Sequence, residues 1–229
     1  METYKIITDE QALKDFISWL PELQKHEKYY FCLFARSKYC KTVTHISSDK
    51  AQLKRGVSDK ERLFHKIKQL ELPLGMYTQK GLSVPQEALA LYITTNPRSM
   101  PKAAANLLVK LATSMRDQNT EMNCHAEALS QIQKAKSRTV YIDFDIDISE
   151  ELELTQVMRQ LETYVNKDAI TWLKTRGGVH CLIAPEKIEE QYKKSFYNDI
   201  IKNLPVDQVG DCMIPVPGTY QGGFTPKFL

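Results

Sequence analysis

The stretch RTVYIDFDI (residues 138–146) decides how the second half of this chain folds. It is rich in β-branched and aromatic residues, which favour a strand. Successive side chains of a strand point to opposite faces of its sheet, so this alternating pattern separates two sets. The apolar set, expected to face two covering helices, is Ile142, Phe144 and Ile146. The set expected on the opposite, open face is Tyr141, Asp143 and Asp145.

The segments that follow complete a recognisable order of elements. Apolar spacing predicts helices over 152–166 and 187–204, and strands over 169–175, 179–184 and 212–217. Arg176-Gly177-Gly178 links the two middle strands as a hairpin, and two prolines make the last strand an edge. The resulting order is βαββαβ, the ferredoxin-like arrangement. In that arrangement the first strand lies between the third and the fourth, and both neighbours are antiparallel to it.

The first half reads as a mixture of helices and strands. Helices are expected over 9–24, from Ser58 to about 70, from Ser99 to about 117 and over 124–135, with strands over 29–37 and 88–95. Thr8 with Gln11, and Ser58 with Glu61, have the spacing of capping boxes. The predicted fold class is α+β. An N-terminal α/β module (1–130) packs on a ferredoxin-like, RRM-like βαββαβ catalytic module (131–229), with the active-site cleft between them.

Charge is distributed unevenly along the 229 residues. The net charge is +3, but residues 1–120 hold 19 Lys and Arg against 12 Asp and Glu, whereas residues 121–229 hold 12 against 16. A basic half followed by an acidic half is expected when a polyanion-binding arm is joined to a cation-binding site. A solvated helix face over 50–68, where much of the basic excess lies, is the alternative.

Several classes of protein are disfavoured by composition. The five cysteines are scattered without a CxxC pair, so we expect free thiols and no structural zinc, although Cys40 and His45 could supply two ligands. No apolar run approaches the roughly 18 residues of a membrane span, and the N-terminus lacks an apolar signal-peptide core. We therefore expect an intracellular, cytoplasmic protein with no membrane partner, and a virus or mobile element is a plausible source.

Acidic residues from separate parts of the sequence converge in the predicted sheet. Alternation in the strand 179–184 puts His180 on the same face as Asp143 and Asp145, and Asp207 and Asp211 precede the last strand near the same end. Two carboxylates at i and i+2 are about 7 Å apart, and hard oxygen ligands suit Mg²⁺ or Mn²⁺. The alternative is an ordinary surface strand with solvated acids. Asp147 is interpreted as a turn or cap residue for the next helix.

The stretch KTRGGVH (174–180) is a second candidate element of the site. Two glycines would let the backbone approach a phosphate, with positive charge beside it on Lys174 and Arg176. A plain hairpin turn is the alternative for Gly177 and Gly178.

These motifs together resemble the archaeo-eukaryotic primase superfamily, which includes the primase-polymerases. The hhDhDh motif is matched by residues 141–146, the small-x-His motif by 178–180, and the hydrophobic-Asp motif by Val206-Asp207, followed by Pro217-Gly218-Thr219. The resemblance covers about 138–220. It implies that Asp143, Asp145 and Asp207 bind two Mg²⁺ or Mn²⁺ ions, with Asp211 as the alternative third acid. It also implies that His180 contacts the phosphates of the incoming nucleotide.

The activity implied is template-directed addition of nucleotides to a 3′-hydroxyl, by a DNA primase or primase-polymerase. Its partners would be single-stranded or primed DNA, nucleoside triphosphates, and a helicase or another replication protein. Arg98 and Lys102, at a strand–helix junction, are expected to face nucleic acid. Two alternatives stay open: a non-catalytic single-stranded nucleic-acid-binding module, and another metal-dependent phosphodiester enzyme such as a nuclease or cyclase.

Overall fold

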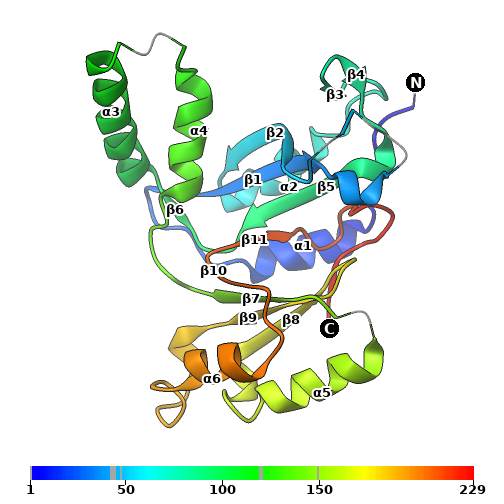
Figure 1. Cartoon of the computed structure of the whole chain (residues 1–229), viewed down its shortest axis with the longest axis vertical. Helices are drawn as coiled ribbons and strands as arrows, with labels where there is room; N and C mark the ends of the chain where they lie inside the picture. The colour runs from blue at the N-terminus through cyan, green and yellow to red at the C-terminus, as the bar shows by residue number, and fades with distance from the viewer. Residues whose placement is uncertain (1, 42–44, 47, 119–120, 149) are drawn as a thin grey trace.

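The computed structural model describes residues 2–41, 45–46, 48–118, 121–148 and 150–229. Within these residues the fold is mixed α+β, with six α-helices and three antiparallel sheets. Figure 1 shows two main sheets, one above the other in that view, with the helix of residues 10–19 between them. The helices of residues 151–161 and 196–203 lie beneath the lower sheet, and those of residues 100–116 and 124–134 project away. The third sheet is the two-stranded hairpin of β3 (Thr78–Gln79) and β4 (Leu82–Ser83).

The first sheet is built around a nearly continuous buried strand, β1 (Glu27–Ala35). Its strand order is β11-β5-β1-β2, with β11 (Met213–Pro215), β5 (Leu89–Thr94) and β2 (Ala51–Ser58), and the short β6 (Arg98–Ser99) also pairs with β1. Helices α1 (Glu10–Trp19) and α2 (Lys60–Lys68) bury apolar stripes against the same core. The buried residues of those stripes are Leu13, Phe16, Leu63 and Ile67.

Three local predictions for this half need correction. Helix α2 begins after Asp59 with no side-chain cap, so Ser58 and Glu61 do not form the predicted capping box. Helix α1 begins after Asp9, whose side chain accepts the Ala12 N–H, so Thr8 and Gln11 do not form the capping box. Residues 51–58 form strand β2, which pairs with β1. The alternative interpretation of the basic stretch 50–68, a solvated helix face, is therefore wrong for this part of it. The short alternating run in β2 is half-buried, because Ala51 and Leu53 pack against the first core while Gln52 and Lys54 are exposed on the other face.

The second sheet has the strand order β10-β7-β9-β8-β12. Its strands are β7 (Ile142–Ile146), β8 (Ile170–Lys174), β9 (Val179–Ile183), β10 (Gln208–Gly210) and β12 (Lys227–Phe228). Helices α5 (Glu151–Leu161) and α6 (Phe196–Asn203) cover one face (Figure 1). As the alternation predicted, Phe144 and Ile146 are buried on that face, together with Val179 and Cys181 from β9.

The predicted last strand is wrong in its position. The fourth strand of the second sheet is Gln208–Gly210, which pairs with β7, and not residues 212–217. Residues 213–215 cross to the first sheet and pair with β5, where Ile214 joins the first core. Gly210 permits the change of direction because its φ of +126° is unfavourable for other residues. The helix predicted from 187 is also shorter, and begins at Phe196.

The face of the second sheet that was expected to be open is largely covered by the first half of the chain. Leu173 and Leu182 point away from α5 and α6 and belong to the first core. Tyr141 stacks on Trp19 of α1, with 4.5 Å between ring centroids. The two sheets therefore share a buried interface, and Asp145, on the same face, remains partly exposed at one end.

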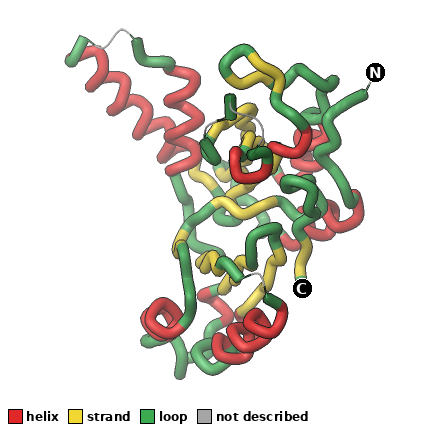
Figure 2. Tube along the Cα trace, turned by 45° about the vertical axis from the view of Figure 1, so that its right-hand side comes forward, coloured by secondary structure: helices red, strands yellow, loops and turns green. Residues whose placement is uncertain are grey.

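Two helices, which lie between β6 and β7 in the sequence, form a projecting hairpin. They are α3 (Met100–Arg116), capped by Ser99 as predicted, and α4 (Cys124–Lys134). Figures 1 and 2 show this hairpin extending away from both sheets, with α3 on the outside. Among the described residues, no helix combines the length and the apolar character that crossing a membrane requires.

We expect acid to lower the stability of the fold through Glu27, the first residue of β1, which binds Arg138. Burial alone would raise the pKa of Glu27, but hydrogen bonds from the Gln24 N–H, Ser137 and Arg138 outweigh it, so its pKa is lowered. A carboxyl with a lowered folded-state pKa stabilises the fold above its unfolded value, and that stability is lost as pH falls through the folded value. Urea denaturation from pH 7 to pH 3 should therefore show a steeper loss of stability for wild type than for Glu27→Gln. Equal slopes would contradict this prediction.

Candidate functional site

The centre of the candidate site is a histidine held between two aspartates on neighbouring strands. Asp145 on β7 lies directly opposite His180 on β9 in the antiparallel register. His180 Nδ1 lies 3.0 Å from both carboxylate oxygens of Asp143, and its Nε2 lies 3.6 Å from Asp145 Oδ1. Asp143 is almost fully buried, with 1% exposure, whereas Asp145 is partly exposed. Asp143 therefore fixes the orientation of His180, and Asp145 is the carboxylate that can meet a ligand.

Electrostatics at this centre reflects an excess of negative charge. Burial raises the pKa of Asp145, and the neighbouring charges of Asp143, Asp147 and Asp207 raise it further, against the opposing effect of His180. Burial would lower the pKa of His180, but the charge and hydrogen bond of Asp143 outweigh burial, and the pKa of His180 is raised. A region of clustered carboxylates is one that a cation would stabilise.

This centre opens into a cleft of about 640 Å³ between the two sheets. The second sheet and the crossover to β11 contribute its acidic side: Asp145, Asp147 and Asp211. Across from them, the cations that line the cleft come mainly from the segment after β1 and from α4: Arg36, Lys38, Lys50 and Lys134. Aromatic rings lie among these cations, with the Arg36 guanidinium 5.2 Å from the Tyr92 ring centroid and 5.8 Å from that of Tyr39. The cleft thus has an acidic wall and a mainly basic, aromatic wall, in which the Asp49 carboxylate accepts hydrogen bonds from the Ser37 hydroxyl and the Lys38 N–H.

Asp147 takes a place that sequence reasoning had given to a cap. Helix α5 follows Glu150 as its N-cap residue, and Asp147 instead lines the cleft beside Asp145. Asp207 is exposed, and its N–H donates to the Asp145 carbonyl at 2.8 Å, so it lies next to the acidic centre without lining the cleft. The alternation 143, 145, 147 was the signal that could have assigned Asp147 to the site.

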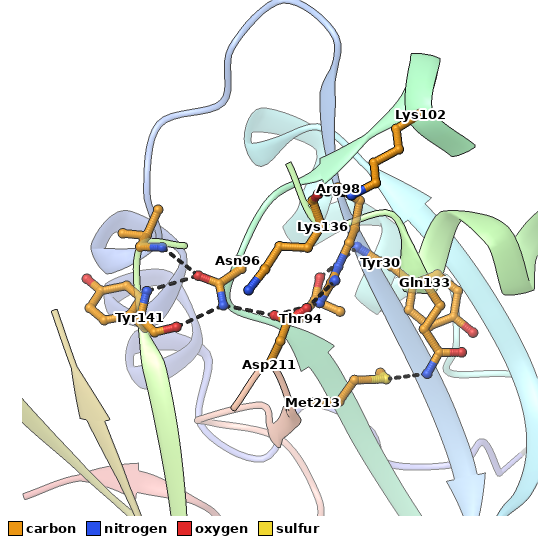
Figure 3. A network of polar contacts seen from close by, with 11 residues as sticks. Tyr30, Thr94, Asn96, Arg98, Lys102, Gln133, Lys136, Tyr141, Asp211 and Met213 are labelled. Carbon is orange, nitrogen blue, oxygen red and sulfur yellow. Dashed lines mark hydrogen bonds and ion pairs between the residues drawn. The ribbon is translucent and has the colours of Figure 1, made fainter. Parts of the chain in front are cut away.

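Asp211, the alternative third acid, is engaged in a buried polar network (Figure 3). Arg98 binds it with two nitrogens, Nη1 to Oδ2 at 2.5 Å and Nη2 to Oδ1 at 3.0 Å. Asn96 Nδ2 donates to Asp211 Oδ1 at 2.8 Å, and Asn96 Oδ1 accepts the N–H groups of Val140 and Tyr141. The network joins the end of β5, the segment leading into β7, and the crossover between β10 and β11.

The two cations predicted to face nucleic acid lie in different surroundings. Arg98 is 1% exposed, and its guanidinium binds the carboxylate of Asp211, which lines the cleft with it. It is buried because β6 pairs with β1 at the base of the helical hairpin, directly behind the Asp211 carboxylate. Lys102 is exposed on the first turn of α3, with its Nζ 3.4 Å from the Lys136 carbonyl.

The glycine turn between β8 and β9 is a hairpin, as predicted, but its residues serve different purposes. Gly177 lines the cleft, whereas a Cβ on Gly178 would lie 2.2 Å from the Ile146 carbonyl oxygen. Arg176 is outside the cleft lining and lies over the Tyr39 ring, 4.5 Å from its centroid. Lys174 is opposite Lys227 in the pairing of β8 with β12. Gly178 therefore permits the close approach of β7 to β9.

Gly178→Ala should be destabilising while Gly177→Ala should be tolerated. A methyl group at Gly178 must displace the backbone of Ile146 and Asp147, and overpacking of this kind costs about 1–3 kcal/mol. A methyl group at Gly177 meets only the Asp147 carboxylate at 3.6 Å, an ordinary contact. Urea denaturation of the two variants checks this difference. Equal stabilities would contradict the packing role of Gly178.

The C-terminal segment forms part of the wall of the cleft. Gln221 is 3% exposed, and its side chain accepts the Arg176 N–H at 2.9 Å and donates to the Tyr39 hydroxyl at 3.0 Å. The Pro217-Gly218-Thr219 turn lies against the start of α1, where the Gly218 carbonyl accepts the N–H groups of Thr8 and Asp9. The segment thus ties both sheets together beside the cleft.

The donor set available to a metal ion is carboxylate oxygen together with the His180 imidazole. Within the part of the chain that the structure describes, no group of three or more His, Cys, Asp or Glu side chains is already arranged as a coordination site. Asp145 and Asp147 are the carboxylates that face the cleft beside His180, and both are hard ligands suited to Mg²⁺ or Mn²⁺.

Sequence reasoning missed the cations on the opposite wall. Arg36 and Lys38 directly follow β1, and Lys50 directly precedes β2, so both strands present positive charge at the same end of the first sheet. The basic run after the predicted strand 29–37 was a usable signal. The position of these cations across the cleft from Asp145 and Asp147 could not be predicted, because it depends on how the two sheets pack.

Comparisons with protein-family models, with curated proteins and with solved structures gave no match to this chain.

Proposed function

We propose that this chain is a template-directed nucleotidyltransferase, a DNA primase or primase-polymerase that adds nucleotides to a 3′-hydroxyl. The observation that carries the proposal is the cleft in which Asp145, Asp147 and His180 face Arg36, Lys38 and Lys50. Phosphoryl transfer depends on positioning and on neutralising charge at the phosphates, and it needs no protein nucleophile. A carboxylate wall opposite a cationic wall supplies both requirements for a nucleoside triphosphate.

The strand order supports the same assignment of fold. If β7, β8, β9 and β10 are taken as the four strands of a ferredoxin-like, RRM-like module, the observed order β10-β7-β9-β8 is the fourth, first, third and second, as that fold requires. The hhDhDh strand is then central and its acids lie at the cleft. We propose residues 1–130 as the template-side module and 131–229 as the catalytic module, with β11 and the C-terminal segment packed across to the first sheet.

In this proposal the basic wall holds the phosphates of the substrate. Lys38 and Lys50 are exposed at the mouth of the cleft, and Arg36 lies deeper against Tyr92. Charge-assisted hydrogen bonds from such cations are the usual means of binding phosphate. The rings of Tyr39 and Tyr92 offer apolar surface next to these cations, where a base or sugar could lie.

The acidic wall fits a divalent cation by its chemistry. Its carboxylates are crowded enough to raise the pKa of Asp145, which is the condition that a bound cation would relieve. Asp145 and Asp147 would hold Mg²⁺ or Mn²⁺ at the cleft, with Asp207 adjacent. When bound, such ions neutralise the triphosphate and lower the pKa of the attacking hydroxyl.

His180 and Asp143 have complementary parts in the proposal. Asp143 occupies the Nδ1 side of His180, which leaves Nε2 on the side of Asp145 and the cleft, available to a phosphate oxygen. Asp143 is thus a positioning residue here, although the family resemblance had made it a metal ligand.

Incorporation of labelled nucleotides tests the proposal. Protein, Mg²⁺ or Mn²⁺, and either ribo- or deoxyribonucleoside triphosphates are incubated with single-stranded and with primed DNA. Products that lengthen on primed DNA would support a polymerase, and products on unprimed DNA a primase. Shortened DNA would indicate a nuclease instead, cyclic nucleotides a cyclase, and binding without any product the non-catalytic nucleic-acid module.

Lys38→Ala/Lys50→Ala should weaken nucleoside triphosphate binding at least about tenfold, because each lost charge-assisted hydrogen bond is worth about 1.5–3 kcal/mol. The salt dependence of binding should become shallower for the same reason. Titration of a fluorescent triphosphate at several salt concentrations measures both effects. Lys167→Ala/Lys187→Ala, on exposed turns at the far end of the second sheet, is the matched control. Equal affinity of the two double variants would count against the basic wall.

A further inference from the structure

Helix α3 presents an apolar stripe that the rest of the described chain leaves exposed. The stripe follows helical spacings of three and four along the outer side of the hairpin, and it consists of Pro101, Ala104, Ala105, Leu108, Ala112 and Met115. Leu108 is 67% exposed and Met115 is 80% exposed, and the adjoining Val109 is 69% exposed. The buried residues of α3 are Ala103 and Ser114, so the stripe is a second face, distinct from the face that is already covered. Exposed apolar patches of this kind mark interaction sites.

Charge along one side of this stripe restricts the occupant. Lys102 and Arg116 are exposed beside the stripe, and no acidic residue occurs on α3 between Met100 and Arg116. Arg116 is paired with Asp117, which follows the helix, whereas the Lys102 ammonium lies near a backbone carbonyl. Two copies of this surface would bring like charges together, which opposes self-association. An occupant with acidic residues beside an apolar stripe would be complementary.

Side-chain size further restricts the occupant. Ala104, Ala105 and Ala112 are small, so another backbone can approach α3 closely, while Leu108 and Met115 project as anchors between them. A partner helix packed along α3 would place its own side chains at i, i+3, i+4 and i+7 over the small alanines and between the Leu108 and Met115 anchors. A membrane surface is less suited, because binding there relies on Trp, Phe and Leu, and the stripe has one leucine and no aromatic residue.

We propose that the outer face of α3 is a docking surface for an acidic amphipathic helix of another protein. The hairpin projects from the two sheets (Figures 1 and 2), so a bound helix would meet neither the candidate active site nor the interface between the sheets. This proposal does not depend on the enzymatic activity proposed above, since it rests on α3 alone.

Selection from a phage-displayed library of α-helical peptides tests the docking surface. The full chain is the bait, and the selected peptides are measured against wild type and two variants. Leu108→Glu should weaken their binding at least tenfold, whereas Leu152→Glu should not, because Leu152 is a similarly exposed leucine on α5. The selected peptides should carry a net negative charge. The charge reversal Lys102→Glu should weaken the binding of these peptides, and should do so less at high salt.

Three results would overturn the proposal. The first is a selection that yields no peptide, or only peptides that bind Leu108→Glu as well as wild type. The second is sedimentation of the chain with vesicles of phosphatidylserine and phosphatidylcholine that Leu108→Glu abolishes, which would assign the face to a membrane surface. The third is a dimer in analytical ultracentrifugation that the same substitution dissociates, which would assign it to a second copy of this chain. Circular dichroism of each variant confirms that the helices are retained.

Discussion

Asp145→Asn is expected to reduce nucleotide incorporation at least about 100-fold while leaving the fold intact. The Asp145 carboxylate lies on β7 opposite His180 and lines the cleft, where charge on the reacting phosphates must be neutralised. Removing one well-placed electrostatic group from such a site typically costs a factor of 100 to about 1,000. Stability should not fall, because the charge of Asp145 is disfavoured by burial and by three neighbouring aspartates. Loss of activity without loss of stability would therefore identify a functional carboxylate.

A matched substitution separates this effect from a general change of charge. Asp168→Asn removes the same charge from an exposed position in the turn before β8 and should retain wild-type incorporation. Both variants are compared with wild type in the same primer-extension assay and by urea denaturation. Full activity of Asp145→Asn, or equal losses in the two variants, would remove Asp145 from the proposed site.

Asp211→Asn is expected to destabilise the protein by about 3 kcal/mol. The substitution removes the negative partner of Arg98, whose guanidinium is buried and whose Nε has no hydrogen-bond partner among the described residues. Removing one member of a buried pair commonly costs about 3–5 kcal/mol, because an uncompensated charge remains in the interior. The lower end applies here because Asp211 is partly exposed and asparagine keeps one acceptor. The midpoint of urea denaturation measures the effect.

Primer extension together with urea denaturation distinguishes the two candidates for the third acid, Asp207 and Asp211. Asp207 is exposed, and Asp207→Asn should change stability by less than about 0.5 kcal/mol. If Asp207 assists the cation site, its variant will lose activity at unchanged stability. If Asp211 were a metal ligand and not a structural residue, Asp211→Asn would lose activity without destabilisation, and that result would contradict the assignment of its network.

The placement of the site was predictable where local patterns decide it. Alternation in RTVYIDFDI and VHCLIA correctly separates Phe144, Ile146 and Cys181 from the face that carries Asp143, Asp145 and His180. Those patterns are short-range, because side-chain direction in a strand follows from its period of two. The glycine turn was likewise predictable from the residues next to it in the sequence, and the hairpin of β8 and β9 forms as expected.

The remainder depends on packing between distant segments. The strand order around β10 and β11 could not be read from the sequence, because VGDCMIPVP is apolar enough to pair with either sheet, and the first core takes Ile214 and Val216. Arg98 resembled a surface phosphate contact until β6 placed it behind Asp211. Asp143 shares a face with Asp145, yet Asp143 is buried and Asp145 remains partly exposed at the cleft.

The most direct test of nucleotidyl transfer is the addition of a single nucleotide to a primed template whose next base is known. Purified wild-type chain is incubated with Mn²⁺ and each of the four deoxyribonucleoside triphosphates, and separately with each ribonucleoside triphosphate. We predict that the primer gains one residue only with the complementary nucleotide of at least one sugar type. Failure to extend with every nucleotide while the template is bound would contradict the proposed function, as would extension that ignores the template base.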